Sequence, residues 1–389
     1  MATFELETSV GWENSASPAR NIELHEPVSC EIGLKLAGPR TLAKPASERQ
    51  PVTSGHLSRN ESLRLDTPDL SVVIVNYYQW KNTAMLVSQL RRCDLMRSQA
   101  AEVLIVDNHS PHDPIVSKLR RCPGVSLRRW GRNRGFSRAV NEGVRLSRGE
   151  WVLLLNPDMS LPPDFLDQVL TEAKAILAED QTTGIIGFGL KDEDGSEQLS
   201  TGQFPTFAGT LAGLFRSRAK RKYCSLPGQG KGRVDWVTGC CMLVRRSCLD
   251  ALGGLDQDFF LYYEDVDLCR RATEAGYTVW FTPATRAIHL NPLHRRAVPA
   301  TLRVVTRHSL LTYGLKHWSR WQFFLLAKII QWEATCRKLL AHARGDRTAV
   351  KLFGRLQHIT KQMREGHKRS ARKNLMRVTK TACFYQESQ

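Results

Sequence analysis

Four apolar stretches of similar length alternate with amphipathic segments in the first half of the chain. The apolar stretches are rich in Val, Ile and Leu and cover residues 70–76, 102–106, 125–130 and 151–155. The amphipathic segments have helical spacing and cover residues 80–97, 114–121 and 136–146. Strands that alternate with helices are typical of βαβ units, whose parallel strands are buried on both faces. The sequence therefore predicts an α/β fold with a doubly wound, mainly parallel sheet flanked by helices.

Polar residues follow each of these predicted strands. The set consists of Asn76, Asp107, the turn 133–135, Asn156 and Asp158. A single polar residue at a strand end is an ordinary turn signal. The carboxyl ends of parallel strands, however, meet at one edge of a sheet, and ligands bind beyond that edge. No GxGxxG or P-loop sequence follows the first strand, so the usual dinucleotide and phosphate cradles are absent.

A second cluster of interest is the pair of adjacent carboxylates Glu264 and Asp265, which follows the aromatic run 259–263. An apolar pocket wall at this point would raise a carboxyl pKa and favour a general base. The alternative is a helix N-terminus whose acids interact with the helix dipole. The helix is predicted to run to Gly276 and to be followed by a strand at 277–281.

Charge is distributed very unevenly along the 389 residues. The net charge is +18, and residues 291–389 contain 21 Lys and Arg against 4 Asp and Glu. A basic tail on a nearly neutral body indicates an anionic partner, either lipid headgroups or nucleic acid. Residues 1–66 lack apolar periodicity and are predicted to be a disordered leader. The ten Cys form no CxxC pair and no signal peptide is evident, which favours a reducing, cytoplasmic setting.

The tail contains an apolar stretch that begins with 318–326 and is interrupted by Lys328. This run is too short to span a membrane. Its Trp, Phe and Leu beside Lys and Arg suit a helix that lies in the headgroup plane, but also a docking helix that covers the domain. The two alternatives remain open. Residues 343–380 are strongly basic and retain helical spacing.

Taken together, these motifs resemble family-two glycosyltransferases, which are inverting enzymes of the GT-A fold, and in particular the bacterial rhamnosyltransferase-like branch. The segments that carry the resemblance are 71–78, 106–110, 133–136, 141–143, 155–158, 236–239, 253–256, 259–268 and His289. The resemblance covers about residues 70–292. It implies a glycosyltransferase domain, 67–295, with a nucleotide-sugar half (67–160) and an acceptor half (161–295), followed by a basic helical tail (296–389).

The resemblance also implies roles for individual residues. Asp265 matches the catalytic base, Asp107 the contact to the nucleotide base, and Asp158 with His289 the ligands of a divalent cation, Mg²⁺ or Mn²⁺. The other donor-binding positions are Asn76, Asn133, Arg134, Gly135, Asn141 and Asn156. Trp236, Gly239 and Glu264 fall on the acceptor or supporting side, although Trp236 also suits a core position. The metal motif is Asn-Pro-Asp instead of the usual two-Asp form, so metal affinity should be lower because an amide oxygen carries no charge.

These implications predict an inverting glycosyltransferase that moves L-rhamnose from dTDP-L-rhamnose to a hydroxyl of a polysaccharide or a polyprenyl-linked glycan. It would act in the cytoplasm, with peripheral contact to the inner face of the plasma membrane. One alternative is an enzyme of the same fold that uses another nucleotide sugar. A nucleotidyltransferase is a further rival, but residues 76–78 are not its Gly-rich loop. The alternative from another class is a non-enzymatic nucleic-acid-binding protein, but no recognised nucleic-acid module is present and no nucleic acid is expected as a partner.

Overall fold

The central strand of the fold is β1 (Leu70–Asn76), in which every residue is buried. The computed structural model describes residues 67–213, 230–290 and 299–380, so the leader predicted for 1–66 lies outside the described residues. Strand β1 pairs in parallel with β2 (Ala101–Asp107) on one side and β4 (Trp151–Leu155) on the other. In this register Asn76 lies opposite Asp107, so the predicted polar strand ends are neighbours.

The main sheet has the strand order β3-β2-β1-β4-β11-β6-β12-β5. Its remaining members are β3 (Val125–Arg129), β5 (Met159–Ser160), β6 (Thr183–Lys191), β11 (Cys241–Arg245) and β12 (Thr278–His289), with β7 (Glu197–Gln198) beside β6 and β9 (Gly232–Arg233) beside β12. A separate pair joins β8 (Thr201–Gly202) to β10 (Trp236–Val237). Strand β11 is antiparallel to β4 and β6, whereas β12 is parallel to β6. The predicted α/β fold with a mainly parallel sheet of the GT-A type is confirmed.

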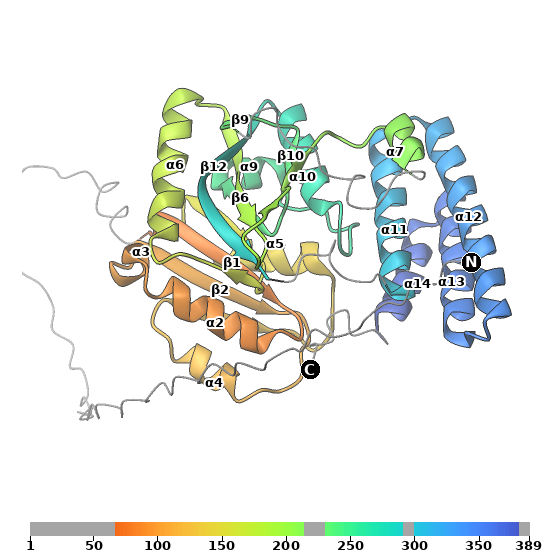
Figure 1. The fold of residues 1–389 in the computed structure, drawn as a ribbon, viewed down its shortest axis with the longest axis horizontal. Helices are drawn as coiled ribbons and strands as arrows, with labels where there is room; N and C mark the ends of the chain where they lie inside the picture. The colour runs from red at the N-terminus through yellow and green to blue at the C-terminus, as the bar shows by residue number, and fades with distance from the viewer. Residues whose placement is uncertain (1–66, 214–229, 291–298, 381–389) are drawn as a thin grey trace, which may run out of the picture. The chain divides into compact units, whose positions relative to one another are not determined.

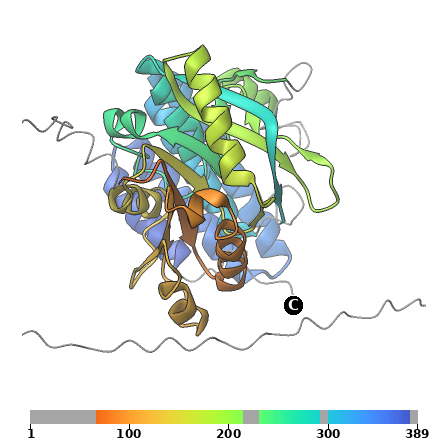
Figure 2. The same ribbon diagram turned by 90° about the vertical axis from the view of Figure 1, so that its left-hand side faces the viewer.

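Helices cover both faces of the sheet (Figures 1 and 2). One face packs against α2 (Trp80–Leu90), α3 (Asp94–Arg97), α4 (Ile115–Arg120) and α6 (Phe165–Glu179). The other packs against α5 (Phe136–Leu146), α9 (Arg246–Leu252) and α10 (Glu264–Glu274). Alternate residues of β1 serve the two cores, with Val72 and Ile74 on one side and Val73 and Val75 on the other. A strand between two helical layers must be apolar on both faces, which is why β1 reads as a continuous apolar run.

Two elements differ from the prediction. The helix expected over 80–97 is two helices, because the backbone at Cys93 is extended (φ −68°, ψ 145°). The strand expected over 277–281 continues to His289, because a register shift between Thr282 and Arg286 lets the strand pass Pro283. As a result His289 pairs with Met159 of β5, next to Asp158.

The tail is helical, as predicted, and has its own apolar core. It consists of α11 (Ala300–His317), α12 (Arg320–Ala343), α13 (Arg347–Arg364) and α14 (Lys368–Thr379), which stand side by side in Figure 1. Phe207, on the short helix α7 (Phe207–Gly213), and Phe260 contribute to this core. Within the described ranges no helix combines the length and apolarity that a bilayer crossing requires.

Candidate active site

The ends of β1 and β2 are joined by a buried hydrogen-bond network. Asn76 Nδ2 donates to Asp107 Oδ1 at 3.0 Å and to Ser110 Oγ at 2.9 Å. Arg129, the last residue of β3, donates from Nε to Asp107 Oδ2 at 2.9 Å. Asn76 and Asp107 are fully buried. A buried carboxylate needs such partners, because an unpaired one would destabilise the fold by several kcal/mol. The network therefore fixes the backbone of the sheet edge where the sequence predicted nucleoside contacts.

The turn after β3 is tied to the end of β2 through Asn108. Asn108 Nδ2 donates to Asn133 Oδ1 at 2.9 Å, and Asn108 Oδ1 accepts from the Arg134 backbone N–H at 2.8 Å. The Arg134 guanidinium lies over the Trp130 ring, 4.7 Å from its centroid, on the exposed side of the turn. Its charge is thus positioned at the surface beside the edge, where an anionic group can approach.

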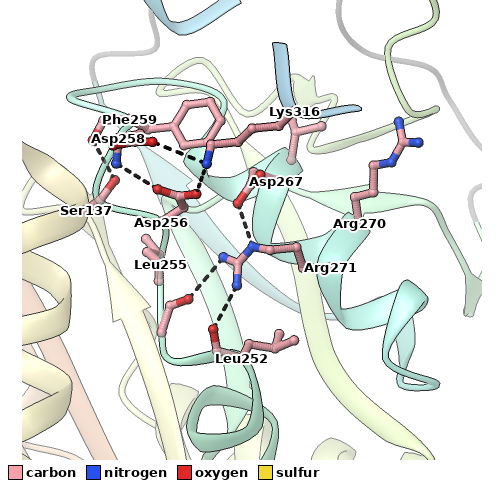
Figure 3. A network of polar contacts seen from close by, with 12 residues as sticks. Ser137, Leu252, Leu255, Asp256, Asp258, Phe259, Asp267, Arg270, Arg271 and Lys316 are labelled. Carbon is pink, nitrogen blue, oxygen red and sulfur yellow. Dashed lines mark hydrogen bonds and ion pairs between the residues drawn. The ribbon is translucent and has the colours of Figure 1, made fainter. Parts of the chain in front are cut away.

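Gly135 brings this turn into direct contact with the loop before Asp265. Its φ is 95°, and a Cβ added at this position would lie 2.9 Å from Phe260 Cδ2. The Phe136 N–H donates to the Phe260 carbonyl at 2.7 Å, and Ser137 Oγ donates to the Phe259 carbonyl at 3.0 Å (Figure 3). The predicted donor side and the predicted catalytic loop are therefore physically joined.

Asn141 holds the same loop from a second side. Its Nδ2 donates to the Leu255 carbonyl at 2.7 Å, and its Oδ1 accepts from the Leu255 N–H at 2.9 Å. This pairing resembles a backbone bridge, and it uses both ends of the amide. The contact that Asn141 makes is therefore to the protein backbone, which differs from the donor contact that the sequence predicted.

Asp265 lies in the first turn of α10 and contacts Gly239, in the turn before β11. Its Oδ2 accepts from the Gly239 N–H at 3.2 Å, and its Oδ1 accepts from the Val266 N–H at 2.9 Å. The carbonyl of the following residue, Cys240, accepts from the Asn156 N–H at 2.9 Å. Asp265 and the Asn-Pro-Asp motif thus lie on either side of the short segment 239–240. Two backbone amides fix the orientation of the carboxylate.

Left-handed backbone conformations gather around this edge. Tyr262 and Tyr263 have φ of 72° and 69° immediately before α10, and Tyr78 and His109 have φ of 60° and 78° just after β1 and β2. Bulky residues rarely adopt this region, at a cost of about 1–3 kcal/mol each. Such conformations persist where the surroundings impose them, and they are concentrated at functional sites. Here they direct Glu264 and Asp265 into the interior, where both are buried.

Asp158 and His289 face each other at the β5–β12 pairing. His289 Nε2 lies 3.5 Å from Asp158 Oδ1, and that buried oxygen accepts no hydrogen bond from the described residues. On the other side of the ring, His289 Nδ1 lies 3.2 Å from the Gln198 amide. In the tautomer in which His289 Nδ1–H donates to Gln198 Oε1, His289 Nε2 carries no hydrogen. Its lone pair then points toward Asp158. One carboxylate and one imidazole fit Mn²⁺ or Mg²⁺ as two ligands of a shell completed by phosphate and water.

No larger cluster of His, Cys, Asp and Glu with metal-binding geometry occurs within residues 67–213, 230–290 and 299–380. The pair Asp158 and His289 is therefore the donor set that this edge offers. Asn156, half-buried after β4, is the nearest addition along the chain.

Polar contacts attach both α10 and α11 to the loop before α10 (Figure 3). Arg271 Nε donates to Asp267 Oδ2 at 2.7 Å, and its other nitrogens donate to the carbonyls of Leu252 and Gly254. Asp267 is fully buried and paired with Arg271. From α11, Lys316 Nζ lies 2.5 Å from Asp256 Oδ2. Burial raises the pKa of Asp256, but Lys316, the Asp258 N–H and the Arg271 charge together hold that pKa below its ordinary value.

Trp236 takes the core position that was the alternative to a role on the acceptor side. Its side chain is fully buried, and Nε1 donates to the Gln203 carbonyl at 2.9 Å. Cys241 is also buried, and burial raises the pKa of its thiol well above the ordinary value. A thiol of that kind is a packing residue rather than a nucleophile.

Four residues of the site were missed by the sequence analysis: Ser110, Arg129, Gln198 and His317, whose Nε2 lies 2.8 Å from Asp267 Oδ1. Arg129 carried a usable signal, because it ends the strand next to β2 and lies in register with Asp107. Ser110 follows Asp107 by three residues, which is the spacing of a side chain that closes a turn. Gln198 and His317 are placed by tertiary packing alone, and no local pattern marks them.

Comparison with known proteins finds a glycosyltransferase family model and relatives named as rhamnosyltransferases. The family model described as glycosyl transferase family 2 matches residues 71–253. An N-acetylglucosaminyl-diphospho-decaprenol L-rhamnosyltransferase of Mycobacterium tuberculosis is 30% identical over 243 residues, which is 57% of this chain and 76% of that protein. A dTDP-rhamnosyl transferase of Shigella flexneri is 23% identical over 225 residues, or 57% of this chain and 69% of that protein. A crystal structure of GalNAc-T7 with UDP, GalNAc and Mn²⁺ aligns with a TM-score of 0.43 and 15% identity, over 63% of this chain and 48% of that one.

Proposed function

The chain belongs to glycosyl transferase family 2, and we propose that it transfers L-rhamnose from dTDP-L-rhamnose to a hydroxyl of a polysaccharide or lipid-linked glycan. That it is a nucleotide-sugar-dependent glycosyltransferase follows from the family, so the predicted enzyme class is confirmed. The choice of donor is supported by relatives that are named as rhamnosyltransferases. The single observation that carries the reaction is the contact of Asp265 with Gly239, one residue from the backbone bond that holds Asn156.

In this proposal Asp265 is the general base. Its carboxylate takes the proton from the acceptor hydroxyl while that oxygen attacks the anomeric carbon, a role worth about 10²–10⁴-fold in rate. A single displacement opposite the leaving diphosphate inverts the configuration. Glu264 supports the first turn of α10, and the bonds from Gly239 and Val266 orient the base. The donor would occupy the half at 67–160 and the acceptor the half at 161–295, with Arg134 near the diphosphate.

A divalent cation would be held by Asp158 and His289, with Gln198 orienting the imidazole. When bound, it would stabilise the negative charge that develops on the leaving diphosphate. Because the motif offers one carboxylate where a two-Asp motif offers two, we expect weaker affinity for the cation. Chelation should abolish transfer and added Mn²⁺ or Mg²⁺ should restore it. Transfer that is unaffected by chelator would remove the cation from the proposal.

The acceptor is proposed to be polyprenyl-linked, which would place the enzyme at the cytoplasmic face of a membrane. The M. tuberculosis relative supports this proposal, since its name specifies a diphospho-decaprenol acceptor. The net charge of the tail supports contact with anionic lipid.

The base assignment is tested by Asp265→Asn, which keeps the size of the side chain. We expect transfer to fall by at least about 10²-fold with donor binding retained. Asp250→Asn, at an exposed position on α9, is the matched control and should transfer as the wild type does. Turnover of Asp265→Asn within a few-fold of the wild type would refute the assignment.

The donor is tested by thermal shift with dTDP-L-rhamnose, UDP-sugars and GDP-sugars in the presence of Mn²⁺. A ligand that binds only the folded state raises the melting temperature by mass action, so the preferred donor should give the largest shift. A larger shift with a UDP- or GDP-sugar would replace rhamnose in the proposal and leave the mechanism unchanged.

A further inference from the structure

Helix α12 carries most of the exposed large hydrophobic side chains among the described residues. Of the ten large hydrophobic side chains that are exposed, six lie on this helix: Trp321, Phe324, Leu325, Trp332, Leu339 and Leu340. Trp321 and Trp332 are 62% and 70% exposed. The spacing of these residues places them along one side of a helix. We call these six residues the outer face of α12.

The opposite side of α12 is packed in the ordinary way. Phe323, Leu326, Ala327, Ile330 and Ala334 are buried against the other helices of the tail. The docking-helix alternative from the sequence therefore accounts for one side of α12 only. The outer face remains exposed, and large apolar side chains gathered on one side of a folded helix mark an interaction site.

The charges around the outer face identify the kind of partner. The exposed charged residues between 320 and 340 are Arg320 and Lys328, and both are cations. The acid of this helix, Glu333, points inward and pairs with Arg307 and Arg337. Residues 299–380 contain 19 Lys and Arg against 3 Asp and Glu, a net charge of +16. Two copies that met through this face would bring two such charges together and repel each other.

A bilayer that contains anionic lipids complements both properties. Trp, Phe and Leu side chains enter the boundary between headgroups and acyl chains, and Lys and Arg remain with the phosphates. Each basic residue near an anionic surface adds to the electrostatic attraction. We propose that the outer face of α12 binds the surface of an anionic bilayer, with the helix axis in the headgroup plane.

This surface has a direct connection to the catalytic loop. Helix α12 packs on α11, and α11 contacts the loop before Asp265 through Ser309, which donates to the Leu261 carbonyl at 2.8 Å. Membrane contact at α12 would therefore hold the active site near a lipid-linked acceptor. That use rests on the proposed function, whereas the binding itself does not.

The test uses the full-length chain in sedimentation with phosphatidylcholine vesicles, with and without phosphatidylglycerol. We expect binding to the anionic vesicles, weak binding to the neutral ones, and a loss of at least tenfold in Trp321→Glu/Trp332→Glu. Met85→Glu, which places the same charge at an exposed hydrophobic position on α2, is the matched control and should bind as the wild type does. Brominated lipid should quench the fluorescence of the wild type more than that of Trp321→Phe/Trp332→Phe.

Three outcomes would overturn the proposal. The first is equal vesicle binding by the wild type and the double glutamate variant. The second is equal binding to neutral and anionic vesicles. The third is that the wild type binds no vesicles and forms a dimer by light scattering, whereas the double variant is a monomer, since a second copy would then cover the face.

Transfer to a short, soluble acceptor separates this proposal from the proposed function. Such transfer should be unchanged in the double variant. Its absence from the wild type would count against the proposed function alone.

Discussion

His317 Nε2, at the end of α11, lies 2.8 Å from Asp267 Oδ1, which is two residues beyond Asp265 on α10. Because a carboxylate only accepts, the imidazole donates this bond. Asp267 is fully buried and has Arg271 as its other partner. The C-terminal helices are thus fastened to the helix that carries the proposed base.

This relationship predicts the effect of His317→Ala. Removing the donor leaves a buried carboxylate oxygen without that bond, so we expect the free energy of unfolding to fall by about 1–3 kcal/mol. Because α10 loses one of its polar contacts with α11, kcat should fall several-fold while KM for the donor changes little. Urea unfolding and steady-state kinetics measure the two effects. His367→Ala, at an exposed position after α13, is the control. Equal stability and kcat in both variants would contradict the anchoring role.

The contact between Gly135 and Phe260 predicts a difference between two glycines of the same turn. Gly135→Ala would place a methyl group 2.9 Å from Phe260 Cδ2 and 3.0 Å from the Phe260 carbonyl oxygen, at a φ of 95°. The loop before Asp265 must then shift, so we expect lower stability by at least about 1 kcal/mol and a loss of transfer of tenfold or more.

Gly131→Ala is the matched control for this prediction, because a Cβ there meets no atom within 4 Å and the backbone is not left-handed. Circular dichroism melting and transfer assays compare the two variants. Full activity in Gly135→Ala would show that the turn and the catalytic loop move independently.

The strands of the site were predictable because local chemistry determines them. Buried parallel strands require β-branched and aliphatic residues on both faces, and polar residues can follow only where the strand leaves the sheet. The sequence therefore placed Asn76 and Asp107 at adjacent strand ends, and the structure pairs them. The helix Phe136–Leu146 was predicted with its observed bounds, since Gly135 precedes it and its apolar spacing is regular.

The parts that escaped prediction depend on tertiary contacts. A proline normally argues against continuing a strand, and only the register shift against β6 lets β12 pass Pro283 and reach His289. The partner of His289 is Gln198, whose position follows from the pairing of β7 with β6. Arg129 was read as a strand residue, yet its neighbour in the sheet makes it the counter-ion of Asp107. The local pattern around these residues encodes none of these distances.

His308, buried on α11, predicts a pH dependence of stability. Burial, together with nearby Arg372, lowers the pKa of His308 from its ordinary 6.5 to about 4, against the opposing effect of Asp258. The unfolded chain binds the proton more readily than the folded chain does. His308 therefore leaves the free energy of unfolding unchanged above pH 6.5 and lowers it as the pH falls toward 4. Between pH 7.5 and 5.5 the loss should be about 1 kcal/mol.

The measurement for His308 is urea unfolding at the two pH values. His308→Leu removes the titrating group and should flatten the dependence by that amount, whereas His358→Gln, at an exposed position on α13, should leave it unchanged. A dependence as steep in His308→Leu as in the wild type would assign the titration to other groups.

Gln198 provides a test of the cation site that does not alter either proposed ligand. Its amide lies 3.2 Å from His289 Nδ1, on the side of the ring opposite Asp158. Loss of such an orienting partner typically weakens metal affinity by about 10–100-fold. In Gln198→Leu we therefore expect the Mn²⁺ concentration for half-maximal transfer to rise by that factor, with kcat at saturating Mn²⁺ within a few-fold of the wild type.

Gln198→Glu distinguishes orientation from packing, because a carboxylate at the same position can still accept from Nδ1–H. The glutamate variant should recover much of the affinity for Mn²⁺ that the leucine variant loses. Gln181→Leu, at an exposed position after α6, controls for the loss of an amide elsewhere on the surface. A leucine variant with an unchanged Mn²⁺ requirement would mean that His289 needs no orienting partner, and the assignment of its Nε2 to the cation would lose its structural basis.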